Sequence, residues 1–238
     1  MATFVLLHGA FAGGWQWRKP AQLLQAAGHA VLRPTLTGLG ERVHLATPEV
    51  GLYTHIEDVV NVFRYEEVQD AILVGYSYSG MVATGVAERI PELIRELVYL
   101  DADVPQDGQS EADLYPEAVA YLGDLAREYG DGWRLPNPRP DLPLCTDHPL
   151  KTCLEPVHLH NPLARALPRS FIWCSKDKDP ADVMMNRVAE FAAQARADPK
   201  WRYYELPTGH LPWLTMPEAT AELLLQIAAE DTRVRVPA

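Results

Sequence analysis

The sequence has little of what several protein classes require. Its three cysteines, Cys145, Cys153 and Cys174, are too few and odd in number for the disulfide framework of a small secreted domain. We therefore expect free thiols and a cytoplasmic location.

No apolar run approaches the ~20 residues that cross a bilayer, and residues 1–10 lack a charged leader followed by a long apolar region. The sequence thus predicts neither a membrane span nor a secretory signal.

Basic residues are also scarce. Lysine and arginine number 21 against 32 acidic residues, a formal net charge of −11, and no basic cluster is present that could follow a phosphate backbone. We therefore expect no nucleic-acid partner.

The length of 238 residues and the hydrophobic fraction of 47% are typical of one folded globular domain with room for an insertion. Nothing in the sequence locates an oligomer interface.

Short apolar runs alternate with helical patterns along the chain. The apolar runs predict buried strands at residues 3–7, 30–32, 71–74, 97–100, 171–174 and 203–206. The helical patterns occupy residues 20–27, 55–63, 81–90, 183–197 and 217–229. This alternation predicts an α/β protein with a doubly wound, mostly parallel sheet.

Residues 104–168 break the alternation. They hold 10 of the 20 prolines, which rules out a regular strand–helix–strand unit there because proline interrupts helices and central strands. We predict that this stretch is an inserted lid over the carboxyl ends of the strands. Residues 1–103 and 169–238 would then form the core.

The strongest chemical signal is Gly75-Tyr76-Ser77-Tyr78-Ser79-Gly80, which follows a predicted strand and opens a predicted helix. The context predicts a nucleophile elbow, a strained turn in which the residues two before and two after the nucleophile must be small. Ser77 meets this condition through Gly75 and Ser79, although the usual second glycine is replaced by Ser79. The alternative nucleophile, Ser79, has Met81 two residues later, which would crowd the turn.

A serine nucleophile needs a base and an acid that orients the base. His210 follows the last predicted strand and is the predicted base. Asp177, which comes soon after the strand at 171–174, is the first choice for the acid. Asp101 and Asp103, which follow the strand at 97–100, are the alternatives, ahead of Asp179.

The oxyanion of acyl transfer needs two backbone N–H donors. Tyr78, directly after the nucleophile, is the predicted first donor. Ala10, or else Phe11, is the predicted second donor, because the glycine-rich loop after the first strand can approach a ligand closely. His8 is interpreted as a loop anchor. The loop lacks G-x-G-x-x-G, and Trp15 stands where a phosphate-binding loop needs lysine, so we expect no nucleotide.

The predicted lid is rich in residues that can ligate metals. These residues are Cys145, His148, Cys153, His158 and His160. Their spacing gives no C-x-x-C or H-x-x-x-H pair, so we expect no metal and no organic cofactor. Phe11 and Trp133 are predicted to line an apolar substrate pocket.

These residues, in the order His8-Gly9-Ala10, Ser77, Asp177 and His210, resemble the α/β-hydrolase superfamily over nearly the whole chain. Residues 4–10 and 13–15 are similar to the branch that contains plant methylesterases and hydroxynitrile lyases. Residues 37–45 (TGLGERVHL) are similar to bacterial esterases of that branch, including pyrethroid and carbamate hydrolases.

The resemblance implies a cofactor-free serine hydrolase that cleaves a carboxylic ester of a small apolar or aromatic substrate through an acyl-enzyme. Amide or carbamate hydrolysis, or tailoring of a natural product, is the alternative activity. The lyases of this branch use a threonine and a lysine at the positions of Gly9 and Leu211, so the lyase activity is disfavoured. A ligand-binding receptor of this fold is disfavoured by the intact Ser77 and His210.

Overall fold

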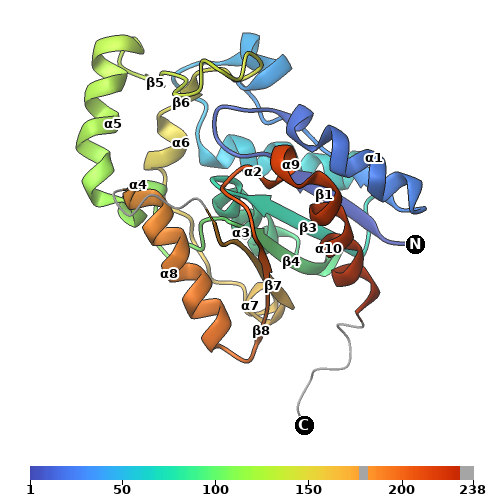
Figure 1. Cartoon of the computed structure of the whole chain (residues 1–238). Helices are drawn as coiled ribbons and strands as arrows, with labels where there is room; N and C mark the ends of the chain where they lie inside the picture. The colour runs from blue at the N-terminus through green and yellow to red at the C-terminus, as the bar shows by residue number, and fades with distance from the viewer. Residues whose placement is uncertain (177–181, 231–238) are drawn as a thin grey trace.

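A six-stranded sheet forms the centre of the computed structural model, which describes residues 1–176 and 182–230 (Figure 1). The strand order is β2-β1-β3-β4-β7-β8, and neighbouring strands run parallel. This confirms the predicted α/β class and doubly wound sheet. The strands are β1 (Thr3–Leu7), β2 (Ala30–Leu32), β3 (Ala71–Tyr76), β4 (Ile94–Leu100), β7 (Arg169–Cys174) and β8 (Trp201–Leu206).

Helices cover both faces of this sheet (Figure 1). Successive side chains of a strand point to opposite faces, so the apolar residues of β1 are divided between two clusters. Phe4 and Leu6 of β1 are buried in one apolar cluster with residues of α1 (Arg18–Ala26) and α10 (Pro217–Ala229). Val5 and Leu7 are buried in a second cluster on the other face. That cluster contains residues of α2 (Leu52–Tyr65), α3 (Ser79–Arg89) and α8 (Val183–Ala197).

The segment at residues 104–168, hereafter the cap segment, contributes no strand to the six-stranded sheet. Its paired strands β5 (Arg134–Leu135) and β6 (His148–Pro149) were not predicted. Its helices are α4 (Glu111–Leu114), α5 (Pro116–Tyr129), α6 (Lys151–Leu154) and α7 (Pro162–Ala166). The division of the chain into a core and a lid stays a prediction.

The remaining elements are short. Three are 3-10 helices, η1 (Gly14–Trp17), η2 (Gly40–Leu45) and η3 (Pro91–Leu93), and one is the helix α9 (Pro212–Thr215). In the part of the chain that the structure describes, no helix has the length and apolarity that crossing a membrane requires.

Candidate active site

Four loops meet at one edge of the sheet, because the carboxyl ends of parallel strands lie together. Gly9 and Ala10 follow β1, Ser77 follows β3, Asp101 follows β4, and His210 lies in the loop after β8. These are the loops in which ligands of open α/β sheets bind. Ala10, Ser77, Asp101 and His210 therefore lie at the same edge of the sheet.

Ser77 has the backbone of a nucleophile elbow. Its φ of +55° lies in the left-handed region of backbone conformation, which residues other than glycine rarely adopt. The turn leaves no room for larger neighbours: a Cβ added at Gly75 would lie 2.6 Å from the carbonyl oxygen of Ser79. A Cβ at Gly80 would lie 2.0 Å from the carbonyl oxygen of Asp103. The elbow therefore requires the two glycines that flank it in the sequence.

Ser79 occupies a different environment from Ser77. It is fully buried, and its hydroxyl donates a hydrogen bond to the carbonyl oxygen of His8. Ser77 is only half-buried. The Ser79 side chain thus joins the elbow to the loop after β1, which gives a structural reason for serine where the motif usually has glycine.

Ser77, His210 and Asp101 form a continuous chain of hydrogen bonds. The Ser77 Oγ lies 2.9 Å from His210 Nε2, and His210 Nδ1 lies 2.7 Å from Asp101 Oδ2. The contacts assign the tautomer: Nδ1–H donates to the carboxylate, and Nε2 accepts from the serine hydroxyl. Asp101 is fully buried, and its other oxygen accepts from the Cys174 N–H at 3.1 Å.

The structure does not describe the residue that was the first choice for the acid. Asp177 and Asp179 lie outside the described residues, and the carboxylate on His210 Nδ1 is that of Asp101, the sequence-based alternative. Asp103 accepts a hydrogen bond from the Tyr115 hydroxyl instead, and burial raises its pKa well above the usual value. Asp101 follows β4, the strand that pairs with the nucleophile's strand β3, and this strand order is what the sequence did not reveal.

The two predicted oxyanion donors are the backbone N–H groups of Ala10, in the loop after β1, and of Tyr78, directly after Ser77. The Ala10 and Tyr78 N–H groups form no hydrogen bond with any residue of the described chain. The Phe11 N–H, the alternative donor, is already occupied because it donates to His148 Nδ1 at 3.3 Å. Ala10 is therefore better placed than Phe11 for this role.

Left-handed backbone recurs at this edge of the sheet. Phe11 has a φ of +64° and Asp101 a φ of +45°, in addition to Ser77. Each such conformation in a residue other than glycine is costly and persists only where the surroundings hold it. Backbone strain of this kind is concentrated at functional sites, so this pattern supports a functional edge.

Three buried histidines surround the elbow without contacting Ser77. His8 accepts from the Leu36 N–H through Nε2, at 3.0 Å, and Nδ1 faces the Gly9 carbonyl at 2.8 Å. His55 donates from Nε2 to the Thr37 carbonyl and accepts the Tyr78 hydroxyl at Nδ1. Burial lowers the pKa of His8 and of His55 to about 4 and that of His148 well below 6.5. All three rings are therefore neutral near pH 7.

The low pKa of His55 makes its contribution to folding acid-sensitive. The unfolded chain takes up a proton near pH 6.5 and the folded chain only near pH 4, so stability is lost as pH falls between these values. We expect the advantage of the wild type over His55→Gln, in free energy of unfolding, to shrink by roughly 2–4 kcal/mol between pH 7 and pH 4. Urea denaturation of both proteins at the two pH values measures this difference. An equal advantage at both values would contradict it.

The lid residues singled out as metal ligands do not form one group. Among the described residues, one set of candidate ligands stands out: Asp107, His158 and His160, all exposed, with one candidate ligand atom each within 4.8 Å of the others. Asp107 accepts the Leu159 N–H at 2.8 Å, so the set joins the two ends of the cap segment. His148 and Cys153 are buried elsewhere.

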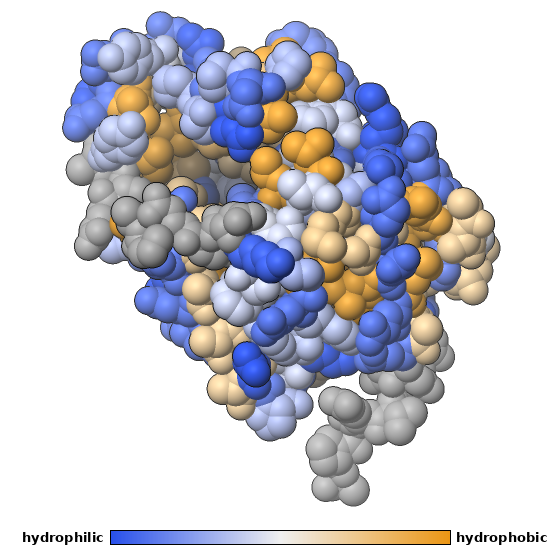
Figure 2. Space-filling model, viewed as in Figure 1, coloured by the Kyte–Doolittle hydropathy of each residue, from blue (hydrophilic) through white to orange (hydrophobic). Residues whose placement is uncertain are grey.

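The predicted pocket residues lie on or beside the cap segment. The Phe11 ring packs against His148, with centroids 5.3 Å apart, and joins a small apolar cluster of Ala126, Leu135 and Cys153. Trp133 is half-buried beneath the Arg134 guanidinium, 5.3 Å from its ring centroid. Figure 2 shows apolar residues gathered at a hollow beside α5. A pocket role for Phe11 and Trp133 stays a prediction.

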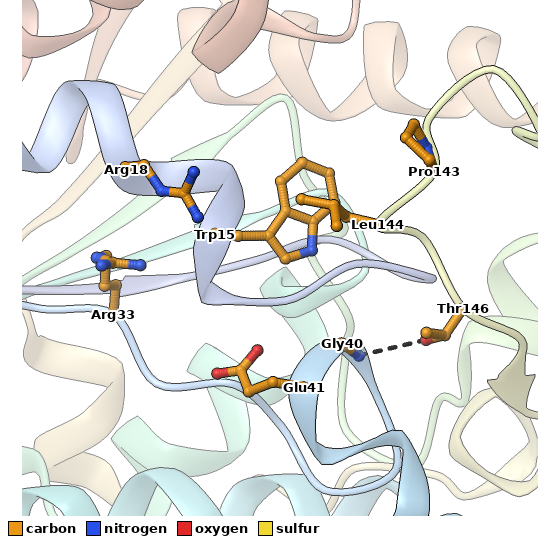
Figure 3. A pocket seen from close by; sticks show the side chains of 8 residues that line it. All are labelled: Trp15, Arg18, Arg33, Gly40, Glu41, Pro143, Leu144 and Thr146. Carbon is orange, nitrogen blue, oxygen red and sulfur yellow. Dashed lines mark hydrogen bonds between the residues drawn. The ribbon is translucent and has the colours of Figure 1, made fainter.

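A separate hollow of about 460 Å³ lies where the cap segment meets the core (Figure 3). Trp15, Arg18 and Arg33 line one side, and Leu144 and Thr146 of the cap segment line the other. Neither Ser77 nor His210 is part of its wall.

Two residues that the sequence did not indicate contact the site. The Tyr76 hydroxyl donates to the carbonyl oxygen of His210, and the two rings lie with centroids 5.1 Å apart. Its place directly before Ser77 is a signal that could have identified it. His148 was considered only as a metal ligand, and no spacing signal connects it to residue 11, which lies 137 positions away.

Known proteins resemble this chain over much or about half of its length. The model of a family described as "Alpha/beta hydrolase family" matches residues 4–223. The chain is 56% identical over 119 residues to a carbendazim hydrolyzing esterase of Nocardioides sp. (strain SG-4G), covering 50% of this chain and 49% of that protein. It is 36% identical over 128 residues to an alpha-hydroxynitrile lyase of Arabidopsis thaliana, covering 51% and 48%.

A solved structure of an extracellular alpha/beta-hydrolase from a Paenibacillus species has the same fold. Its TM-score is 0.77 at 23% sequence identity, and the match covers 95% of this chain and 98% of that one. Its description states structural and functional homology to tobacco salicylic acid binding protein 2. The chain spans about half the length of the curated relatives named above.

Proposed function

Because the chain belongs to the alpha/beta hydrolase family, we propose that it is a serine hydrolase that cleaves carboxylic esters. The observation that carries the proposal is the hydrogen-bonded chain from Ser77 Oγ through His210 to Asp101. This is the arrangement in which a serine gains a base and the base gains an orienting carboxylate. The ester-cleaving relative from Nocardioides supports the choice of bond.

The proposed reaction has two stages. In the first, Ser77 Oγ attacks the ester carbonyl while its proton moves to His210 Nε2, and Asp101 stabilises the imidazolium. The N–H groups of Ala10 and Tyr78 donate to the oxyanion. The tetrahedral intermediate then collapses, the bond to the alcohol oxygen breaks, and His210 gives its proton to the leaving alcohol.

In the second stage, His210 takes a proton from water as the water oxygen attacks the acyl-enzyme. Collapse of this intermediate breaks the bond to Ser77 Oγ, and His210 returns the proton to that oxygen. The products are one carboxylic acid and one alcohol. Every proton transfer uses side chains of this chain, so the proposed sequence needs no cofactor.

Hydroxynitrile lyase activity is less well supported. A Cβ at Gly9 would lie 3.0 Å from the Tyr76 ring and 3.2 Å from the Ser77 Cβ, so a threonine there would be crowded. Leu211 offers no cation for a leaving cyanide. Carbamate hydrolysis is the second candidate, because the Nocardioides relative is described as hydrolysing carbendazim.

The substrate we propose is a small ester with an apolar or aromatic part, and the proposed location is the cytoplasm. Apolar residues at the hollow beside α5 support the substrate class (Figure 2). The location is supported by the three cysteines, none of which forms a disulfide.

Turnover separates a hydrolase from a receptor. We expect repeated release of p-nitrophenol from p-nitrophenyl butyrate, at a kcat within the usual enzyme range of about 1–10³ s⁻¹. Carbendazim in a parallel assay tests the carbamate candidate. Binding of the ester without release of p-nitrophenol, by folded protein, would contradict the hydrolase proposal and favour a ligand-binding role.

A further inference from the structure

The peptide groups on both sides of Phe11 are held by the cap segment. The Phe11 N–H donates to His148 Nδ1 at 3.3 Å, and the Phe11 carbonyl accepts from the Thr146 N–H at 2.8 Å. Phe11 has a φ of +64°, a conformation that needs such external support. It directly follows Ala10, whose N–H is proposed to bind the oxyanion.

His148 can accept this hydrogen bond only at an unprotonated Nδ1. Its Nε2 lies 2.7 Å from Thr152 Oγ1, and that hydroxyl donates to the Pro149 carbonyl, so Nε2 carries the proton. The side chain is fully buried, and burial keeps the pKa of His148 well below 6.5. The tautomer that holds Phe11 is therefore the one that persists at neutral pH.

His148 also packs against the residue that carries the other proposed donor. The centroids of the His148 and Tyr78 rings lie 4.9 Å apart, and the Tyr78 hydroxyl forms a hydrogen bond with His55 Nδ1. A single buried ring thus contacts the segments that carry Ala10 and Tyr78. Nearby, the Thr146 hydroxyl accepts from the Gly40 N–H at 3.3 Å, which ties the same part of the cap segment to the core (Figure 3).

We propose that His148 is a positioning residue for the oxyanion hole, acting through its Nδ1 on the Phe11 peptide. Catalysis would then depend on docking of the cap segment, because the acceptor lies in β6 and the donors lie in the core. This inference rests on the proposed function. His148 would touch no reacting atom, but through the Phe11 peptide it would position the Ala10 N–H donor.

Two variants of His148 distinguish the effect of losing the hydrogen-bond acceptor at Nδ1 from the effect of losing the imidazole ring. In His148→Asn the amide oxygen can take the place of Nδ1, and in His148→Gln the amide group lies at the place of Nε2. We expect His148→Gln to lower kcat for p-nitrophenyl butyrate by about 10–100-fold with KM changed by less than about threefold. We expect His148→Asn to restore kcat to within about fivefold of the wild type.

A second readout follows the oxyanion itself. The affinity for a trifluoromethyl ketone, which forms a tetrahedral oxyanion on serine, should fall in parallel with kcat/KM across the wild type and the two variants. Circular dichroism and the thermal midpoint verify that both variants are folded. The rate of fluorophosphonate labelling gives the same ranking without turnover.

The outcomes are distinct. An active wild type with equal losses in both variants, or with none, would overturn the positioning role and leave the proposed function intact. A wild type that is labelled but turns over no ester would contradict the proposed function, while the labelling rates would still decide the role of His148. A folded wild type with neither turnover nor labelling would overturn both.

Discussion

Replacing Ser77 with alanine is expected to lower kcat for p-nitrophenyl butyrate by about 10⁴–10⁶-fold. The variant lacks the oxygen that lies 2.9 Å from His210 Nε2, so no acyl-enzyme can form. The folded state should persist, because Ser77 is half-buried and the change removes a single oxygen. Initial rates at saturating ester, with the thermal midpoint of each protein, measure both effects.

Ser79→Ala provides the matched control two residues away. It removes a buried hydroxyl that donates to the His8 carbonyl, so it should reduce stability by about 1 kcal/mol and leave the nucleophile in place. Its kcat should remain far above that of Ser77→Ala. A greater loss of kcat in Ser79→Ala than in Ser77→Ala would show that the nucleophile has been assigned to the wrong serine.

Replacing Asp101 with asparagine is expected to lower kcat by about 10⁴-fold. The amide oxygen can still accept from the Cys174 N–H, but the NH₂ group then faces His210 Nδ1 and favours the tautomer that cannot take the serine proton. Steady-state kinetics of the folded variant, with its structure verified by circular dichroism, measure the effect.

Asp177→Asn is the comparison that decides the acid. Asp177 was the sequence-based choice, and since Asp101 lies on His210 Nδ1, we expect its replacement to change kcat by less than about threefold. If Asp177→Asn instead reduces kcat as strongly as Asp101→Asn does, the assignment of Asp101 as the orienting carboxylate is wrong.

Much of the fold follows from local patterns. β1 and β2 have the predicted bounds, because short apolar runs between turns define buried strands. α8 and α10 also match the prediction, helped by local end signals: Asp182 accepts the Met185 N–H at the start of α8, and Pro217 opens α10. β3, β4, β7 and β8 are two or three residues longer than predicted.

What the sequence could not predict depends on contacts between distant segments. The choice between Asp101 and Asp177 requires the order of β3, β4, β7 and β8 in the sheet, which no local pattern contains. The bond from Phe11 to His148 joins residues of the first loop and the cap segment. The elbow was recognisable because its motif occupies six consecutive residues, 75–80, between an apolar run and a helical pattern.

The most direct test of the account is mass spectrometry of the folded protein after treatment with a fluorophosphonate, with Ser77→Ala as the control. The account predicts one adduct, on the peptide that contains Ser77, and its loss in the control. An adduct on Ser79, or no adduct on folded wild-type protein, would contradict the claim that Ser77 is an activated nucleophile.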